Sequence, residues 1–137
     1  MNPASDISVI IPLYNKASSI RRTLRSVVEQ RVQPREIIVV DDGSTDGSAE
    51  IVQSLNAPLV RLLRQPNQGV SVARNRAMAE ASGRWVALLD GDDVLPPNAL
   101  ELFLSRVTDD VDIIVGSVKQ CTDSGNYPHL MEQSRTL

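Results

Sequence analysis

Residues 36–46 read Glu-Ile-Ile-Val-Val-Asp-Asp-Gly-Ser-Thr-Asp, an apolar run that stops abruptly at two aspartates and a glycine. The run is apolar at successive positions, which is typical of a strand covered on both faces of its sheet. Asp and Gly favour the turn that follows. This stretch therefore predicts an inner parallel strand whose carboxyl end carries Asp41 and Asp42.

Apolar runs and helical patterns alternate along the chain on either side of this stretch. Single helices between strands imply right-handed crossovers and a mostly parallel sheet. We therefore predict one α/β domain over residues 1–137, an open, mostly parallel sheet flanked by helices. Strands are expected at residues 7–11, 37–40, 59–63, 85–89 and 111–115, and helices at 18–33, 47–55, 70–81 and from 96 onward.

Several residues are expected to set the ends of these helices. Ser18 or Ser19 would cap the first helix, because a serine hydroxyl accepts from free N–H groups there. Gly83 would end the third helix in a left-handed conformation. The sheet is expected to have an exposed strand edge, which could pair with a second copy of the chain in a homodimer.

Composition excludes several classes of protein. A net charge of −3 in 137 residues argues against a nucleic-acid binder, which carries a basic excess. The single cysteine, Cys121, and the single histidine, His129, exclude an internal disulfide and a zinc cluster. No secretory signal is apparent, so the expected location is the cytoplasm. The first strand lacks the glycine-rich loop of dinucleotide-dependent oxidoreductases.

Acidic residues follow two of the expected strands. In open α/β sheets, ligands bind outside the carboxyl ends of the strands. Five carboxylates are therefore expected at one edge of the sheet, where a cation or several donors would offset their repulsion. They are Asp41, Asp42, Asp90, Asp92 and Asp93.

The Asp90-Gly91-Asp92 sequence is the sharpest of these features. Two carboxylates at the mouth of a strand offer oxygen ligands suited to Mg²⁺ or Mn²⁺, with a substrate phosphate completing the shell. Gly91 would let the backbone bend and leave room for that phosphate. The alternative interpretation is that Asp92 or Asp93 caps the helix beginning near Pro96.

The helix expected at 70–81 places Arg74 beside an apolar stripe. That stripe consists of Val70, Ala73, Ala77, Met78 and Ala81. An arginine in this position needs a partner for its charge. The partner is either a ligand phosphate or one of Asp41, Asp42 and Asp90.

Two further features of the sequence admit alternative interpretations. Tyr14, after the first strand, either packs against its neighbours or stacks on a nucleobase, which the Pro12 carbonyl would also contact. Arg21, Arg22 and Arg25 form either a solvated helix face or a peripheral contact with anionic lipid.

Four stretches, in this order and spacing, resemble the family 2 glycosyltransferases of the GT-A fold, a Rossmann-like fold of nucleotide-diphospho-sugar transferases. They are ISVIIPLYN at 7–15, EIIVVDDGSTD at 36–46, NQGVSVARN at 67–75 and GRWVALLDGDD at 83–93. The resemblance covers residues 7 to about 118 and identifies Asp90-Gly91-Asp92 as the metal-binding DXD motif.

The resemblance implies a role for each matching residue. Pro12 and Tyr14 would contact the uracil, and Asp41 and Asp42 the nucleoside, with Asp42 favoured as the direct contact. Arg74 and Asp90 would help hold the nucleotide. The expected ligands of Mn²⁺ or Mg²⁺ are Asp90, Asp92 and Asp93.

The implied reaction is transfer of a hexose from a nucleotide-sugar, expected to be UDP-linked, to an acceptor hydroxyl with inversion. The acceptor would be a saccharide, a lipid-linked group or a protein. Family members continue beyond this length, so the chain is expected to be a truncated, donor-binding portion. The general base and the acceptor half would lie beyond Leu137. The alternative is a non-catalytic nucleotide-sugar-binding or assembly module with the same fold.

Overall fold

Four parallel strands in the order β3-β2-β1-β4 form one open sheet in the computed structural model, which describes residues 5–116. The strands are β1 (Ile7–Leu13), β2 (Glu36–Asp41), β3 (Val60–Arg64) and β4 (Trp85–Leu88). The helices are α1 (Ile20–Val28), α2 (Ser48–Ser54), α3 (Val70–Glu80) and α4 (Ala99–Ser105). Strands and helices alternate, so the expected α/β class is confirmed.

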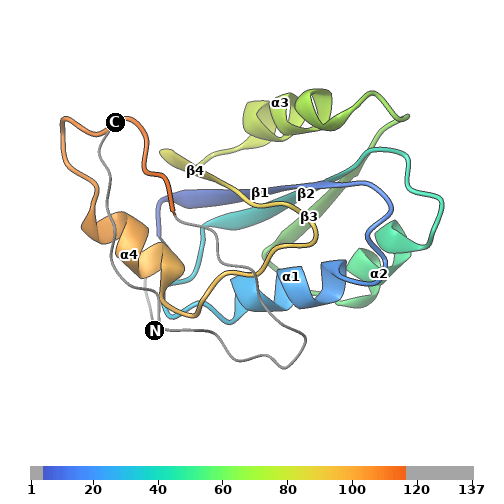
Figure 1. The fold of residues 1–137 in the computed structure, drawn as a ribbon, viewed down its shortest axis with the longest axis horizontal. Helices are drawn as coiled ribbons and strands as arrows, with labels where there is room; N and C mark the ends of the chain where they lie inside the picture. The colour runs from blue at the N-terminus through green and yellow to red at the C-terminus, as the bar shows by residue number, and fades with distance from the viewer. Residues whose placement is uncertain (1–4, 117–137) are drawn as a thin grey trace.

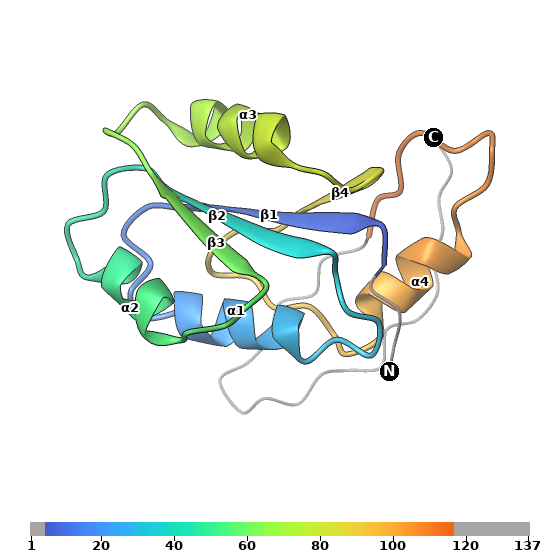
Figure 2. The same cartoon turned by 180° about the vertical axis from the view of Figure 1, so that it is seen from behind.

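Helices cover both faces of the sheet. The helix α3 lies on one face, and α1, α2 and α4 lie on the other (Figures 1 and 2). On β1, Val9 and Ile11 pack toward α1 and α4, whereas Ile10 packs toward α3 with Ile38 and Ala77. These side chains are fully buried, which explains why the inner strands are apolar at successive positions.

The strand order fixes where the chain changes direction across the sheet. From β1 the chain moves outward through β2 to β3, and then returns past β1 to place β4 on its other side. The carboxyl ends of β1 and β4 therefore flank the point where connections diverge. In open α/β sheets this is the position of the ligand crevice.

The strand β4 is outermost and is covered on only one of its faces. Trp85 and Ala87 pack against the core on the α1 side. Val86 and Leu88, which alternate with them, are 39% and 57% exposed. Within residues 5–116, β4 pairs with β1 alone.

The expected fifth strand at 111–115 is wrong for the described part of the chain. Residues 111–116 belong to no strand, and Ile113 and Val115 are 81% and 70% exposed. An apolar β-branched run becomes a strand only where a neighbour supplies hydrogen-bond partners, because strand preference depends on that context. Within residues 5–116 no helix has the length and apolar character needed to cross a membrane.

Three expectations about local structure also need correction. The first helix ends at Val28 rather than near residue 33, and the Ser19 hydroxyl makes no cap hydrogen bond. It donates to the Gly91 carbonyl instead, because the 90–93 loop packs beside the start of α1. Gly83 lacks the positive φ expected of a left-handed helix stop. A Cβ there would lie 2.7 Å from the Ser8 nitrogen, so close approach to β1 is what requires glycine.

A buried carboxylate connects the strands at their amino ends, opposite the expected ligand crevice. Glu36 accepts hydrogen bonds from the hydroxyl of Ser8 at 2.8 Å and from the amide and hydroxyl of Ser82, both at 2.7 Å. Arg61 pairs with its second oxygen at 3.1 Å. Burial alone would raise the pKa of Glu36, but these donors lower it to about 2. The cluster joins β1, β2, β3 and the turn before β4.

Candidate functional site

The loop of residues 90–93 is separated from β4 by Leu89 alone and lies beside the end of β1, where the strand order predicts the ligand crevice. An ideal Cβ on Gly91 would lie 3.5 Å from the carbonyl oxygen of Pro12. The structure therefore brings together two of the expected features, the end of the first strand and the Asp90-Gly91-Asp92 sequence.

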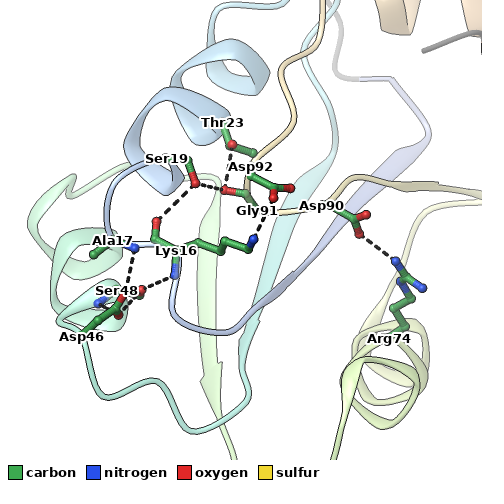
Figure 3. Close-up of polar contacts among 10 residues, drawn as sticks. All are labelled: Lys16, Ala17, Ser19, Thr23, Asp46, Ser48, Arg74, Asp90, Gly91 and Asp92. Atoms are coloured by element: carbon green, nitrogen blue, oxygen red, sulfur yellow. Dashed lines mark hydrogen bonds and ion pairs between the residues drawn. The ribbon is translucent and has the colours of Figure 1, made fainter. Parts of the chain in front are cut away.

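Contacts from three directions hold this loop (Figure 3). From α3, Arg74 pairs with Asp90 at 2.7 Å. From α1, the hydroxyls of Ser19 and Thr23 donate to the Gly91 carbonyl at 2.9 and 3.1 Å. From the β1–α1 loop, Lys16 Nζ lies 2.7 Å from an oxygen of Asp92. A loop fixed at consecutive residues presents its carboxylates in a defined arrangement before any ligand binds.

The carboxylates of this loop differ in their surroundings. The side chains of Asp90 and Asp92 are 52% and 49% exposed. The hydrogen bond from Lys16 lowers the pKa of Asp92. Burial, together with the negative charges of Asp92 and Asp90, raises the pKa of Asp93. The three carboxylates are therefore close enough for their negative charges to repel one another. Arg74 partly neutralises the charge of Asp90, and Lys16 that of Asp92.

The five carboxylates expected at one edge of the sheet all lie at or just after the carboxyl ends of β2 and β4, in two separate groups. Asp41 and Asp42 follow β2, and β1 separates them from the 90–93 loop. Two strand spacings amount to about 10 Å. Within residues 5–116, no three His, Cys, Asp or Glu side chains form a ready set of metal ligands.

A metal shared with a substrate phosphate fits the site better than a metal held by protein ligands alone. Mg²⁺ is usually bound by one or two carboxylates with waters and substrate phosphates. Asp90 and Asp92 are half exposed, and Arg74 and Lys16 already place positive charge on them. Neither Asp92 nor Asp93, the caps considered from the sequence, caps α4, whose N-cap residue is Asn98.

The backbone bend expected at Gly91 does not depend on glycine. Its φ is not positive, and an added Cβ would make ordinary contacts with Lys16, Pro12 and Leu13. That Cβ would point back toward β1. The hydrogen bonds to its carbonyl, rather than unusual backbone freedom, fix the position of the loop.

Asp42 is engaged by the segment that leads into α3. Its carboxylate is buried and accepts from Gln65 Nε2 and the Gln68 amide, both at 2.8 Å, and from the Gly69 amide at 2.9 Å. Burial would raise its pKa, but these donors lower it. An ionised carboxylate accepts about four hydrogen bonds, so one acceptor position remains.

Replacing Asp42 by asparagine is expected to destabilise the fold by about 1–3 kcal/mol, because an amide NH₂ would then face N–H donors. Urea unfolding followed by circular dichroism would measure this. Asp110→Asn, at an exposed position, is the control and should leave the midpoint unchanged. Equal midpoints for the two variants would contradict an anchoring role for Asp42.

Asp41 is also buried, and it faces the opposite side of the sheet from Asp42. Its Oδ1 accepts from the Ser44 amide at 3.2 Å. Its Oδ2 lies 3.4 Å from Arg64 Nε in an ion pair but has no hydrogen bond. The two neighbouring aspartates therefore stabilise different loops.

Arg74 has one of its expected partners, Asp90. The apolar stripe expected beside Arg74 is only partly buried. Ala73 and Ala77 are buried against the sheet, but Val70 and Met78 are 48% and 44% exposed. The small alanines let α3 approach β1 and β2, so the larger residues lie at its margins. Arg74 is one-third exposed and pairs with Asp90 rather than with Asp41 or Asp42.

The loop after β1 is tied to the loop after β2, which the sequence did not predict. Tyr14 is 47% exposed, and the next residue, Asn15, has a φ of 49°. The Asn15 amide donates to the Ser44 hydroxyl at 3.0 Å, and its side chain accepts from the Thr45 amide at 2.9 Å. The Ala17 amide donates to Asp46 at 3.0 Å. These contacts fix where Tyr14 leaves the sheet.

Lys16, Ser19 and Thr23 contact the 90–93 loop but were not predicted as site residues. Each lies within or just before the first helix, where a polar residue is ordinary. The fold itself could have indicated them. The start of α1 follows β1, and β1 pairs with β4, so residues at that helix start lie near the loop that follows β4.

Comparison with known proteins supports a single family. The profile described as glycosyl transferase family 2 matches residues 8–136. The chain is 42% identical over 124 residues to the uncharacterized glycosyltransferase YibD of Escherichia coli K12, covering 88% of this chain and 36% of that protein. It is 40% identical over 106 residues to the chondroitin synthase of Pasteurella multocida, covering 76% of this chain and 11% of that protein.

Two solved structures are similar in fold and sequence. The mannosyltransferase PcManGT of Pyrobaculum calidifontis, in complex with GDP-Man and Mn²⁺, has a TM-score of 0.76 and 30% identity, covering 86% of this chain and 36% of that one. TarS 1–349 of S. aureus, in complex with UDP-GlcNAc, has a TM-score of 0.67 and 32% identity, covering 77% of this chain and 30% of that one. The chain spans about a third or less of the length of each of these proteins.

Proposed function

Because the chain belongs to glycosyl transferase family 2, we propose that it is the donor-binding part of an inverting, metal-dependent hexosyltransferase that uses a nucleotide-sugar, with UDP as the nucleotide. The observation that carries this proposal is the position of the 90–93 loop at the carboxyl ends of β1 and β4, between which the connections of the sheet diverge. Lys16, Arg74 and the hydroxyls of Ser19 and Thr23 hold the loop there. A divalent cation bound with the donor would neutralise charge developing on the departing diphosphate.

Each proposed contact would use a group near the carboxyl ends of the strands. Asp90 and Asp92 would hold the cation, with Asp93 beside them. Arg74, anchored on Asp90, would direct positive charge toward the diphosphate, which an arginine recognises through paired N–H donors. Tyr14, half exposed at the end of β1, offers a surface for the base. Asp42 would accept a nucleoside donor at its remaining acceptor position.

The relatives support parts of this assignment. PcManGT, which resembles this chain in fold and sequence, holds GDP-Man and Mn²⁺, and TarS holds UDP-GlcNAc. These complexes support a nucleotide-sugar donor and a divalent cation for this chain. UDP is favoured over GDP by the resemblance of Pro12 and Tyr14 to a uracil-binding strand end.

A thermal shift experiment would test the proposal. UDP with Mn²⁺, each at about a hundredfold excess over its dissociation constant, is expected to raise the melting temperature by about 5–10 °C. GDP and dTDP with Mn²⁺, and UDP with EDTA, should give smaller shifts. The absence of any shift with all three nucleotides would contradict nucleotide binding. A shift without sugar transfer to any acceptor would favour the non-catalytic alternative.

A further inference from the structure

Lys16 has a fixed backbone and a movable charge. Its amide donates to the Ser48 hydroxyl at 2.9 Å, and its carbonyl accepts from the amides of Ser19 and Ile20 at 3.1 and 2.9 Å. The main chain is thus held by α2 on one side and by the start of α1 on the other. The side chain is 41% exposed, so the ammonium can leave its partner without disturbing the fold.

The ammonium of Lys16 lies where a cation would bind Asp92. Its nitrogen is 2.7 Å from Oδ2 of Asp92, and the Lys16 side chain reaches the 90–93 loop from the side opposite Arg74 (Figure 3). Arg74 is committed to Asp90. Asp90 and Asp92 therefore each have their own positive partner. Of the two partners, Lys16 has the flexible four-carbon chain and lacks the planar guanidinium that fixes an arginine pair.

The ammonium of Lys16 takes up an acceptor position of Asp92, and its positive charge, 2.7 Å from Oδ2, would repel a divalent cation bound to the same carboxylate. We propose that Lys16 competes with the divalent cation for Asp92 in the donor-free protein, and that the donor's diphosphate relieves this competition by offering the ammonium another anionic partner. This inference rests on the proposed function. Its consequence is that the cation and the nucleotide bind cooperatively, because each favours release of Lys16 from Asp92.

Mn²⁺ titrations followed by the electron paramagnetic resonance signal of free Mn²⁺ would test the competition directly. Without nucleotide, Lys16→Gln is expected to bind Mn²⁺ about two- to fivefold more tightly than the wild type, because an exposed ion pair contributes an effect of that order. Arg25→Gln is the matched control. It removes a positive charge that is also exposed and ion-paired, with Glu29, on the polar face of α1.

The second expectation concerns cooperativity. Saturating UDP, after correction for Mn²⁺ bound by free UDP, should increase the Mn²⁺ affinity of the wild type more than that of Lys16→Gln. The ratio of the two increases measures the part of the coupling that passes through Lys16. Arg25→Gln should retain the wild-type ratio.

A readout on the lysine itself is available because the sequence contains only two lysines, Lys16 and Lys119. Reductive methylation with ¹³C-formaldehyde keeps the charge of each amine and labels both lysines and the N-terminal amine. The signal missing from Lys16→Gln and the signal missing from Lys119→Arg assign the two lysines. Mg²⁺ with UDP is expected to shift the Lys16 signal.

The possible results separate the two proposals. If Lys16→Gln binds Mn²⁺ no more tightly than the wild type and Arg25→Gln, the competition is refuted while donor binding stands. An unmoved Lys16 signal on binding of Mg²⁺ and UDP would also refute it. If the wild type and Lys16→Gln both fail to bind Mn²⁺ with and without UDP, the metal-dependent function falls together with the inference.

Discussion

Exchanging Asp92 for asparagine is expected to abolish the Mn²⁺-dependent rise in melting temperature and to lower the affinity for Mn²⁺ in the presence of UDP by at least about 100-fold. Changes to the residues that merely orient metal ligands already cost 10- to 100-fold, so loss of a ligand charge should cost more. The melting temperature without ligand should change little, because the Asp92 side chain is half exposed and its ion pair with Lys16 lies at the surface.

The control for this variant is Asp6→Asn. The Asp6 side chain is 47% exposed and pairs with Arg35 at 3.0 Å, so its environment resembles that of Asp92. Asp6 precedes β1 and thus lies at the amino end of the strands, away from the 90–93 loop. Thermal shifts with UDP and Mn²⁺ should be retained in this control. Retention of the shift in Asp92→Asn as well would show that Asp92 is not needed for the cation.

Glu36→Gln is expected to lower the free energy of unfolding at pH 7 by about 3 kcal/mol, which corresponds to a fall of about 10 °C in melting temperature. The carboxylate accepts from Ser8 and Ser82 at the end of the sheet that carries no proposed ligand. A glutamine places N–H groups against some of these donors. Arg61 keeps its second partner, Glu80, at 3.0 Å, so the loss is centred on Glu36.

The same residue predicts a specific pH dependence. The pKa of Glu36 is lowered in the folded protein to about 2 from an ordinary value of 4.5. The stabilisation is therefore complete above about pH 4.5 and is lost as the pH falls toward 2. Urea unfolding at several pH values should find this loss in the wild type and a smaller loss in Glu36→Gln.

Glu50→Gln serves as the control for the Glu36 experiments. The Glu50 side chain is 62% exposed and lies 3.6 Å from Arg64, so its replacement should leave stability within about 0.5 kcal/mol. If Glu36→Gln and Glu50→Gln unfold at the same urea concentration, the hydrogen bonds around Glu36 do not stabilise the pairing of the strands.

Much of the fold follows from the sequence because the inner strands are covered on both faces. The runs at 7–13 and 36–41 have no polar side to place toward solvent, so they had to lie between helices. The run at 111–115 has a similar composition but belongs to no strand among the described residues. Composition indicates that a segment suits a strand, whereas pairing depends on a neighbour that a local pattern does not identify.

The positions of the acidic residues in the candidate site could be predicted from the sequence, whereas the side chains that pair with them were harder to predict. The position of Asp90 and Asp92 follows from the end of a strand, and Asp90 was among the partners foreseen for Arg74. Lys16 could not be found in the same way, because its contact with Asp92 spans 76 positions of sequence. Ser19 was expected to cap its own helix, and the fold directs its hydroxyl to Gly91 instead.

The short outer strand β4 has a consequence for the motions of the protein. Its four residues hydrogen-bond to β1 alone among the described strands, while β1 is paired on both sides. Amide protons of β4 should therefore exchange with solvent deuterium faster than those of β1 and β2, since opening one ladder frees them. Only Leu89 separates β4 from the 90–93 loop, so a ligand that stiffens the loop should slow amide exchange in β4 more than in β1 or β2.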